Sequence, residues 1–394
     1  MQKFKSSSFI IFLIVFINFL GYGIVFPTLP LLTESYGGTP FLSGIFIAAF
    51  SFMQVLAMPI LGRLSDKYGR RPLLLFSLWG TFFSFFLMGI THSLLWLLIA
   101  RIIDGASGGN LSIAQAYIAD ITDRKNRSSG MGIIGAGITL GFIIGPVWGG
   151  IFSKISPTAP YFSAAVITLI SILLTQFLLP ESVSKKEKVY EKSHFNFATL
   201  FKHFRNAPLF ILFIVTLLLF WGQSGVYTTL SLLGNDVFHL TLLKTSLLFA
   251  FGGILSAFIQ AFLIGKVTKF ISEEKLLIIS AISGTVGFFF MAISENIAIF
   301  VVGMTIFSIG NGFLAPISQG LVSELASEHE QGGIMGILQS FGSIGRIIGP
   351  LLAGFIYQTL NPFAPSAMGA VVFAGIAILG TQFMRKNTSP HFEK

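Results

Sequence analysis

Long apolar stretches alternate with short polar segments along the whole chain. An α-helix needs about 20 apolar residues to cross the hydrocarbon core of a bilayer. The apolar stretches therefore predict an all-α membrane fold with twelve transmembrane helices. The predicted spans are residues 9–32, 43–62, 73–91, 95–119, 129–152, 159–180, 208–232, 245–266, 275–293, 296–320, 333–357 and 364–384.

The longest polar stretch, from Glu181 to Asn206, separates six predicted spans from six. We therefore expect an N-terminal six-helix bundle at residues 1–181, a cytoplasmic linker loop at 182–207 and a C-terminal six-helix bundle at 208–394. Two lysines precede the first apolar run, as in a signal peptide, but the run continues past Pro27 and Pro30 without a small-residue cleavage site. We interpret this run as the first span.

The two halves share a pattern of small residues. The fifth span carries Gly132, Gly141, Gly145, Pro146, Gly149 and Gly150. The eleventh span repeats this spacing with Gly336, Gly345, Gly349, Pro350, Ala353 and Gly354. The displacement from Gly132 to Gly336 is 204 residues. Parallel six-helix repeats, with a site near the bilayer midplane at their interface, are typical of one transporter architecture.

Composition agrees with a membrane protein and excludes an ordinary soluble one. Hydrophobic residues make up 53% of the chain and charged residues 10%, and the mean hydropathy is +0.82. Soluble domains carry about 25% charged residues because water covers their surface. The net charge of +9 does not predict a nucleic-acid partner, because the basic residues lie in loops on one side. The absence of cysteine excludes disulfides and Cys-ligated metal.

The basic residues also predict the orientation. Of the 25 Lys and Arg, all but Lys154, Lys244, Arg101 and Arg346 lie at the N-terminus, in loops that follow even-numbered spans, or in the C-terminal tail. Cytoplasmic loops are enriched in Lys and Arg. We therefore expect a multi-pass protein of the plasma (inner) membrane with both termini in the cytoplasm.

The segment after the second span, residues 62–72, reads GRLSDKYGRRP. It resembles the signature loop of the major facilitator superfamily at every informative position. Asp66 can accept hydrogen bonds from the unpaired N–H groups of a neighbouring helix N-terminus, and Arg70 and Arg71 can pair with carboxylates. With the turn-forming Gly62 and Gly69, these residues are predicted to form a conformational latch. A purely topogenic positive loop is the alternative.

Two further motifs extend the resemblance over essentially the whole chain. Arg101 and Asp104, followed by Gly105, Gly108 and Gly109, are similar to the second signature of the family, which centres on a membrane-embedded arginine. The glycine and proline pattern of the fifth span resembles the family's antiporter signature, which is found mainly in exporters. Such glycines let helices approach closely, and ordinary small-residue packing is the alternative interpretation.

Within the superfamily, the chain is most similar to the twelve-span drug:proton antiporters of the tetracycline-exporter type. Two departures from the pattern matter. The second-half counterpart of the signature loop has Lys269 where Asp66 would sit, so its latch is predicted to be degenerate. Exporters of the tetracycline type carry an aspartate where this chain has Asn18. Coupling through that position is excluded, and tetracycline is not the expected substrate.

Asp104 is the one carboxylate deep within a predicted span, roughly 14 Å from the outer end. Intramembrane charges are costly and mark ion paths by default. Arg101, three residues earlier, lies close to the same helix face. Our hypothesis is that Asp104 is the proton-coupling site and Arg101 its partner. A static ion pair that fixes the fourth helix is the alternative.

Further residues are predicted to line a substrate cavity, because polar side chains within spans usually face the bundle interior. Arg346 could attract an anionic or carbonyl-bearing solute, or bond to backbone carbonyls. Many of the other side chains could equally bridge helices. The candidates are Asn18, Gln54, Asn110, Gln115, Trp221, Gln223, Tyr227, Gln260, Asn311, Gln319, Gln339 and Arg346.

These observations predict a secondary transporter that exports a small amphipathic compound in exchange for protons. An importer or facilitator of a nutrient or siderophore-like metabolite is the alternative within the family. A channel or a membrane receptor is the alternative from another class, although neither a filter sequence nor a large soluble domain is visible. No Walker motif, metal site or catalytic cluster is found. We expect no enzymatic activity, no cofactor beyond the proton gradient, and a functional monomer in lipid.

Overall fold

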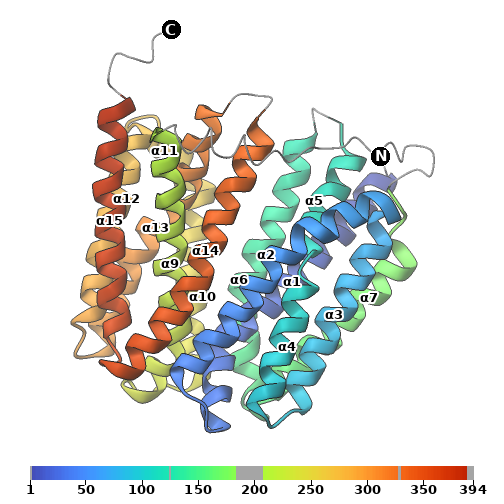
Figure 1. Ribbon diagram of the computed structural model, residues 1–394, viewed down its shortest axis with the longest axis horizontal. Helices are drawn as coiled ribbons and strands as arrows, with labels where there is room; N and C mark the ends of the chain where they lie inside the picture. Colours follow the sequence, from blue (N-terminus) through green and yellow to red (C-terminus); the bar gives the residue numbers. More distant parts are fainter. Residues whose placement is uncertain (1, 124–125, 183–206, 327–329, 388–394) are drawn as a thin grey trace. The chain divides into compact units, whose positions relative to one another are not determined.

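The computed structural model describes residues 2–123, 126–182, 207–326 and 330–387, and these are mostly helical (Figure 1). Apart from its two end residues, the predicted linker loop at 182–207 lies outside the described residues. The helices are α1 (Gln2–Ser35), α2 (Pro40–Tyr68), α3 (Arg70–Ile90), α4 (Leu94–Ala106), α5 (Asn110–Ile121), α6 (Arg127–Phe152), α7 (Ala159–Leu178), α9 (Ala207–Asp236), α10 (Leu242–Phe258), η1 (Ile259–Leu263), α11 (Ile264–Val267), α12 (Glu273–Ala292), α13 (Ile297–Leu325), α14 (Gln331–Thr359) and α15 (Ala364–Asn387).

Within the described residues, twelve helical stretches are long and apolar enough to cross a membrane. The all-α fold and the predicted number of spans are therefore confirmed. In a bilayer core the backbone has no water to bond, so each crossing segment must satisfy its own N–H and C=O groups, as a helix does.

The predicted end of the second span was too early. We expected a loop from Gly62, but α2 continues through Tyr68 and α3 begins at Arg70, so that Gly69 alone makes the turn. Gly69 has φ +107°, a conformation that glycine adopts without the penalty of a Cβ. The signature segment is therefore mainly a helix end.

Two spans that were predicted as continuous helices are irregular. The fourth is broken between α4 and α5 at residues 107–109, which include Gly108 and Gly109. Glycine costs roughly 1 kcal/mol relative to alanine inside a helix, which favours a break there. The eighth contains a π-helical turn, Ile259–Leu263, between α10 and α11. Such turns are rare and recur at functional positions.

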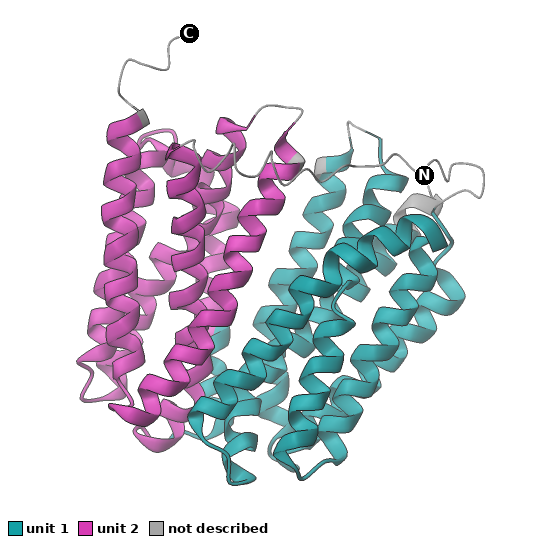
Figure 2. Cartoon of the chain, in the orientation of Figure 1, with its two compact units in different colours: residues 1–192, 239–250 teal, residues 193–238, 251–394 magenta. Residues whose placement is uncertain are grey.

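The chain divides into two compact units (Figure 2). Unit 1 contains residues 1–192 and 239–250, and unit 2 contains residues 193–238 and 251–394. Residues 239–250, which the sequence assigned to the C-terminal bundle, thus group with unit 1.

The same helix pairs pack together in each unit. In unit 1, α1 packs against α6 and α7, while α3 packs against α4 and α7. In unit 2, α9 packs against α14 and α15, while α12 packs against α13 and α15. The two sets of six spans therefore repeat one packing pattern.

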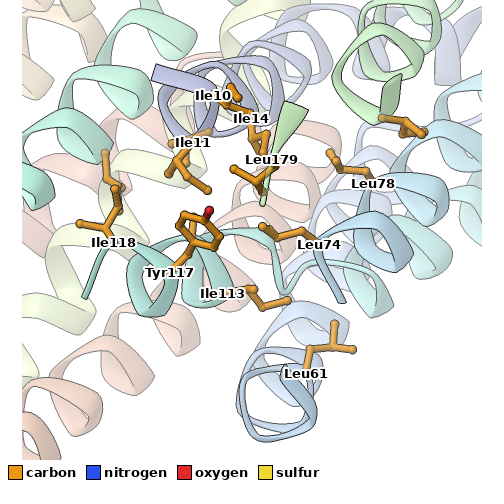
Figure 3. Close-up of a cluster of buried hydrophobic side chains, with 14 of the residues drawn as sticks. Ile10, Ile11, Ile14, Leu61, Leu74, Leu78, Ile113, Tyr117, Ile118 and Leu179 are labelled. Atoms are coloured by element: carbon orange, nitrogen blue, oxygen red, sulfur yellow. The ribbon is translucent and has the colours of Figure 1, made fainter. Parts of the chain in front are cut away.

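A hydrophobic cluster in unit 1 gathers side chains from α1, α2, α3, α5, α6 and α7 (Figure 3). Tyr117 is fully buried in this cluster, and Figure 3 shows its ring among Ile11, Leu74 and Leu179. Its hydroxyl donates a hydrogen bond to the carbonyl oxygen of Pro180 at 2.8 Å. A buried hydroxyl needs such a partner, and this bond connects α5 to the segment that follows α7.

Candidate functional site

Glycines of the antiporter signature lie where α6 meets α1. A Cβ added to Gly141 would lie 2.7 Å from the backbone nitrogen of Leu20, and one added to Gly145 would lie 2.9 Å from Cα of Gly23. Contacts this short are not tolerated by a real side chain. The glycines therefore allow the two helices to approach closely inside unit 1.

The matching glycines of α14 do the same in unit 2. A Cβ on Gly345 would lie 2.9 Å from the backbone nitrogen of Trp221, and one on Gly349 would lie 3.1 Å from that of Gly225. Gly132 and Gly336, the first members of the two patterns, have no atom within 4 Å of an added Cβ. Close packing thus explains part of the repeated pattern and leaves these two positions unexplained.

Gly150 has a different neighbour from the other glycines of α6. An added Cβ would lie 2.8 Å from Oγ of Ser246 and 2.9 Å from Cα of Leu243, both at the start of α10. Ser246 is fully buried. Gly150 therefore permits the close contact that ties residues 239–250 to unit 1.

The signature segment forms a charged network at the predicted cytoplasmic end of unit 1. Arg70 pairs with Asp66 at 2.5 Å and with Asp120 at 3.0 Å, and it donates a hydrogen bond to Oγ of Ser65 at 2.6 Å. The Arg70 side chain is only 10% exposed, so its charge must be compensated by such partners. This network joins α2, α3 and α5.

Glu181 is a member of this network whose role the sequence did not reveal. Its carboxylate accepts hydrogen bonds from the backbone N–H groups of Arg70, at 2.8 Å, and Arg71, at 3.2 Å. It thereby caps the N-terminus of α3, where N–H groups lack helical partners. We expected Asp66 to be such a helix cap, but at α3 Glu181 occupies that position and Asp66 binds Arg70.

Arg101 and Asp104 form a buried ion pair on α4. The distance from Nη1 of Arg101 to Oδ2 of Asp104 is 2.7 Å, and the two residues are 1% and 6% exposed. The guanidinium carbon of Arg101 lies 4.3 Å from the ring centroid of Phe50, a cation–π contact. Nε of Arg101 has no hydrogen-bond partner among the described residues. The predicted pairing is thus present, and it leaves the Nε–H donor of Arg101 without an acceptor among the described residues.

Asp104 faces a small cavity inside unit 1. Its volume is about 10 Å³, which is room for about one water molecule. It is lined by Asn18, Tyr22, Phe50, Gln54, Thr81, Phe85, Asp104 and Gly108. Three predicted residues from three helices, Asn18, Gln54 and Asp104, therefore meet at one site. Thr81 and Tyr22 were missed, because hydroxyls are common on packed helices and nothing in the sequence distinguished these two.

The other predicted cavity residues do not join this site. Asn110 is buried, and neither polar atom of its side chain has a partner among the described residues. Gln115, Gln260, Gln319 and Gln339 are exposed. In unit 2, Tyr227 and Gln223 lie next to each other on α9, whereas Nε1 of Trp221 and Oδ1 of Asn311 are buried without a described partner. The guanidinium carbon of Arg346 lies 3.8 Å from the ring centroid of Phe220.

The family model described as Major Facilitator Superfamily matches residues 11–293 and 259–391. The chain belongs to the major facilitator superfamily. It is therefore a multi-pass membrane transporter of a family that is not a class of enzymes.

Relatives within this superfamily include drug-resistance proteins. The chain is 30% identical over 393 residues to "Tetracycline resistance protein, class B" of Escherichia coli, which covers 96% of both chains. It is 30% identical over 390 residues to "Multidrug resistance protein 2" of Bacillus subtilis (strain 168), which covers 97% of both. The resemblance to this group of exporters is confirmed.

Solved structures share the fold at lower identity. The human organic anion transporter MFSD10 (TETRAN) is 23% identical, with a TM-score of 0.71 over 96% of this chain and 99% of that one. The nucleoside transporter NupG is 17% identical, with a TM-score of 0.76 over 96% and 99%. At these identities the likeness concerns the fold alone.

Proposed function

We propose that this chain exports a small amphipathic compound in exchange for protons by alternating access. Asp104 is the exchangeable proton site and Arg101 is its partner. The carrying observation is a carboxylate in the membrane interior that touches both a buried cation and a cavity. A carboxylate that is buried but accessible to water through a cavity can take up and release a proton, whereas one sealed in an apolar core cannot.

The surroundings of Asp104 support a dynamic pair over a purely static one. The pair carries no net charge when Asp104 is ionised and one positive charge when it is protonated. Amide and hydroxyl groups from α1, α2 and α3 line the same cavity, and polar groups of this kind can stabilise either state by hydrogen bonds. The site is therefore built to tolerate a change of protonation.

The charged network around Arg70 is proposed to act as the conformational latch, with Gly62, Asp66, Gly69 and Arg71. Arg70 joins carboxylates of α2 and α5, and Glu181 caps α3, so that three helix ends move together. Asp66 has a side chain that is 60% exposed and can exchange partners during rocking. Such multi-partner charge clusters are common switch elements.

The export direction is inferred from two observations. The fifth span carries the antiporter signature, and the chain's relatives include proteins named for tetracycline and multidrug resistance. We further propose that the protein works as a monomer in the plasma membrane with both termini in the cytoplasm, as the distribution of Lys and Arg favours.

The test is transport into inverted membrane vesicles under an imposed pH gradient, read with a panel of fluorescent amphipathic dyes. Wild type is expected to accumulate at least one dye when the vesicle interior is acidic, and Asp104→Asn is expected to abolish that accumulation. Asp123→Asn is the matched control, because Asp123 is exposed and bonds only to Asn126 among the described residues. Undiminished proton-driven uptake by Asp104→Asn would remove Asp104 from the mechanism.

A further inference from the structure

The cavity beside Asp104 contains three carbonyl-bearing polar side chains, and one of them can titrate. Asn18 on α1 and Gln54 on α2 present amides to the same small space as the Asp104 carboxylate. An amide has almost the shape of the corresponding acid but neither loses nor gains a proton near neutral pH. Two positions that could hold further acids are therefore held by neutral groups.

The remaining neighbours of Asp104 add one fixed charge. Arg101 on α4 is paired to it at 2.7 Å, and arginine stays protonated at all relevant pH values. From α1 the titratable neighbour is Tyr22, and from α3 the lining residues Thr81 and Phe85 carry no charge. Tyr161 on α7 is fully buried and lies within electrostatic range of Arg101. Both side chains are phenols, so neither adds a carboxyl group to the cavity.

Among the described residues, every other carboxylate of a candidate span lies within one turn of an end of that span. These are Glu34, Asp66, Asp120, Asp236, Glu273, Glu274 and Glu324. Groups at such positions are close to the aqueous boundary and need no cavity to exchange protons with water. Asp104 is thus the single acid of the described membrane interior.

We infer that Asn18 and Gln54 act as charge-setting residues that limit the exchange to one proton per transport cycle. This inference rests on the proposed function of Asp104. The Asp104 carboxylate takes a proton from hydronium through the cavity, which leaves water and a neutral acid, and Arg101 keeps its charge. The reverse step returns the proton to water on the other side. The cavity therefore alternates between no net charge and one positive charge.

Replacing either amide by an acid changes the number of exchangeable protons in the cavity. Asn18→Asp puts a second carboxylate into a space of about 10 Å³ next to the first. Two carboxylates that face one small cavity repel each other, so the two groups titrate one after the other in two steps. The variant carries two exchangeable protons where wild type carries one.

The inference is tested by counting protons on the full-length protein in nanodiscs, which needs no knowledge of the substrate. Proton uptake after a pH jump is measured with an indicator dye, and infrared difference spectra detect the C=O band of a buried protonated carboxyl group. Relative to wild type, Asp104→Asn is expected to bind one proton fewer and to lose the band. Asn18→Asp is expected to bind one proton more and to show a second band.

Gln54→Glu provides a second variant if Asn18→Asp does not fold, because it adds an acid to the same cavity from a different helix. Asn126→Asp is the control, since Asn126 lies in an exposed loop beside Asp123 and a carboxyl there gives no buried band. Two buried bands in wild type, or equal proton counts for wild type and Asn18→Asp, would overturn the inference.

The two proposals fail in different ways. If Asp104→Asn still transports dyes in response to a pH gradient, the proposed function is lost, whatever the proton count. If wild type depends on Asp104 for transport but binds two protons in its interior, the proposed function stands and the limit of one proton is wrong.

Discussion

The fourth span of unit 1 is broken and charged, whereas the tenth span of unit 2 is one continuous helix with no charged residue before Glu324 near its end. The displacement that takes Gly132 to Gly336 also takes Asp104 to Ser308. The acid of the cavity thus becomes a small hydroxyl in the second half. The repeat keeps the packing of the helices and changes the chemistry of the interior.

Aromatic rings fill the interior of unit 2. The ring centroids of Phe288, Phe307 and Phe373 lie 4.5, 5.1 and 5.7 Å apart in the three pairs. A Cβ added to Gly222 would lie 2.8 Å from the ring of Phe373. Gly222 is therefore covered by a phenylalanine ring. One half of the repeat thus holds a buried ion pair beside a cavity, while aromatic rings fill the interior of the other half.

The largest expected effect is on the charged interior of unit 1. Arg101→Met leaves the Asp104 carboxylate without its cation, and breaking a buried pair in this way costs about 3–5 kcal/mol of unfolding free energy. The double variant Arg101→Met/Asp104→Leu is expected to recover most of that loss, because apolar groups can replace a buried pair at little cost. Chemical unfolding in detergent micelles measures both.

The loss in the single variant is expected to shrink as the pH is lowered, because protonation removes the unpaired charge. A single variant as stable as wild type at pH 8 would show that the pair does not stabilise unit 1. Ser308→Asp, at the matching position of unit 2, is expected to destabilise, because the described structure offers no cation beside it.

The contact between α1 and α6 in unit 1 and the contact between α9 and α14 in unit 2 are expected to lose similar stability when a glycine is replaced by alanine. Gly145→Ala in α6 and Gly345→Ala in α14 each force a methyl group against the backbone of the partner helix, which costs about 1–3 kcal/mol. Gly132→Ala and Gly336→Ala are the controls, because an added Cβ at either position meets no atom within 4 Å. Unfolding midpoints of the four variants check the expectation. A large loss at one seam and none at the other would show that the repeated glycines serve different purposes.

Each unit also uses a tyrosine hydroxyl at its predicted outer end, with partners of different charge. Tyr357 donates to the Asp236 carboxylate at 2.7 Å, and Tyr36 donates to the carbonyl oxygen of Thr91 at 2.8 Å. Bonds to charged groups contribute about 1.5–3 kcal/mol and neutral ones about 0.5–1.5 kcal/mol. Tyr357→Phe is therefore expected to lower the unfolding free energy more than Tyr36→Phe. Equal losses would contradict the assignment of the stronger bond to unit 2.

Tyr36 is expected to make the unfolding free energy depend on pH in the alkaline range. Burial raises the pKa of the Tyr36 hydroxyl above its ordinary value of 10.0. The folded state then holds this proton more tightly than the unfolded state, so the contribution is complete below pH 10 and is lost as the pH rises further. Alkaline unfolding curves of wild type and Tyr36→Phe measure it, and wild type is expected to lose stability more steeply above pH 10. Parallel curves would show that Tyr36 does not contribute.

The smallest effects concern the charged network at the predicted cytoplasmic end of unit 1. Glu181→Ala removes the acceptor for two N–H groups of α3, and loss of a helix cap costs about 1 kcal/mol. Asp66→Asn weakens an ion pair whose carboxylate is 60% exposed, and Arg70 keeps Asp120 as a partner, so the expected loss is less than about 1 kcal/mol. Thermal unfolding is expected to rank Glu181→Ala as the less stable of the two. If Asp66→Asn were the less stable variant, Asp66 rather than Glu181 would be the more important residue for capping α3.

Much of this molecule was determined by its sequence read one segment at a time. Span number follows from the length of apolar runs, and the glycines that make the two seams are visible as a repeated spacing. Arg101 and Asp104 could be paired in advance, because residues three apart share a helix face. Each of these features belongs to a single helix or to the comparison of two sequence segments. They can therefore be predicted without knowing how the helices pack.

The tertiary structure decided what lies opposite each of those residues. Asn18, Gln54 and Thr81 come from three helices, and their meeting with Asp104 depends on the rotation of each helix about its own axis. Glu181 caps α3 from a segment more than 100 residues away in the chain, and Phe373 covers Gly222 across a similar separation. Composition cannot supply these pairings, because a membrane helix is apolar on nearly every face and its pattern does not say which neighbour a given face will meet.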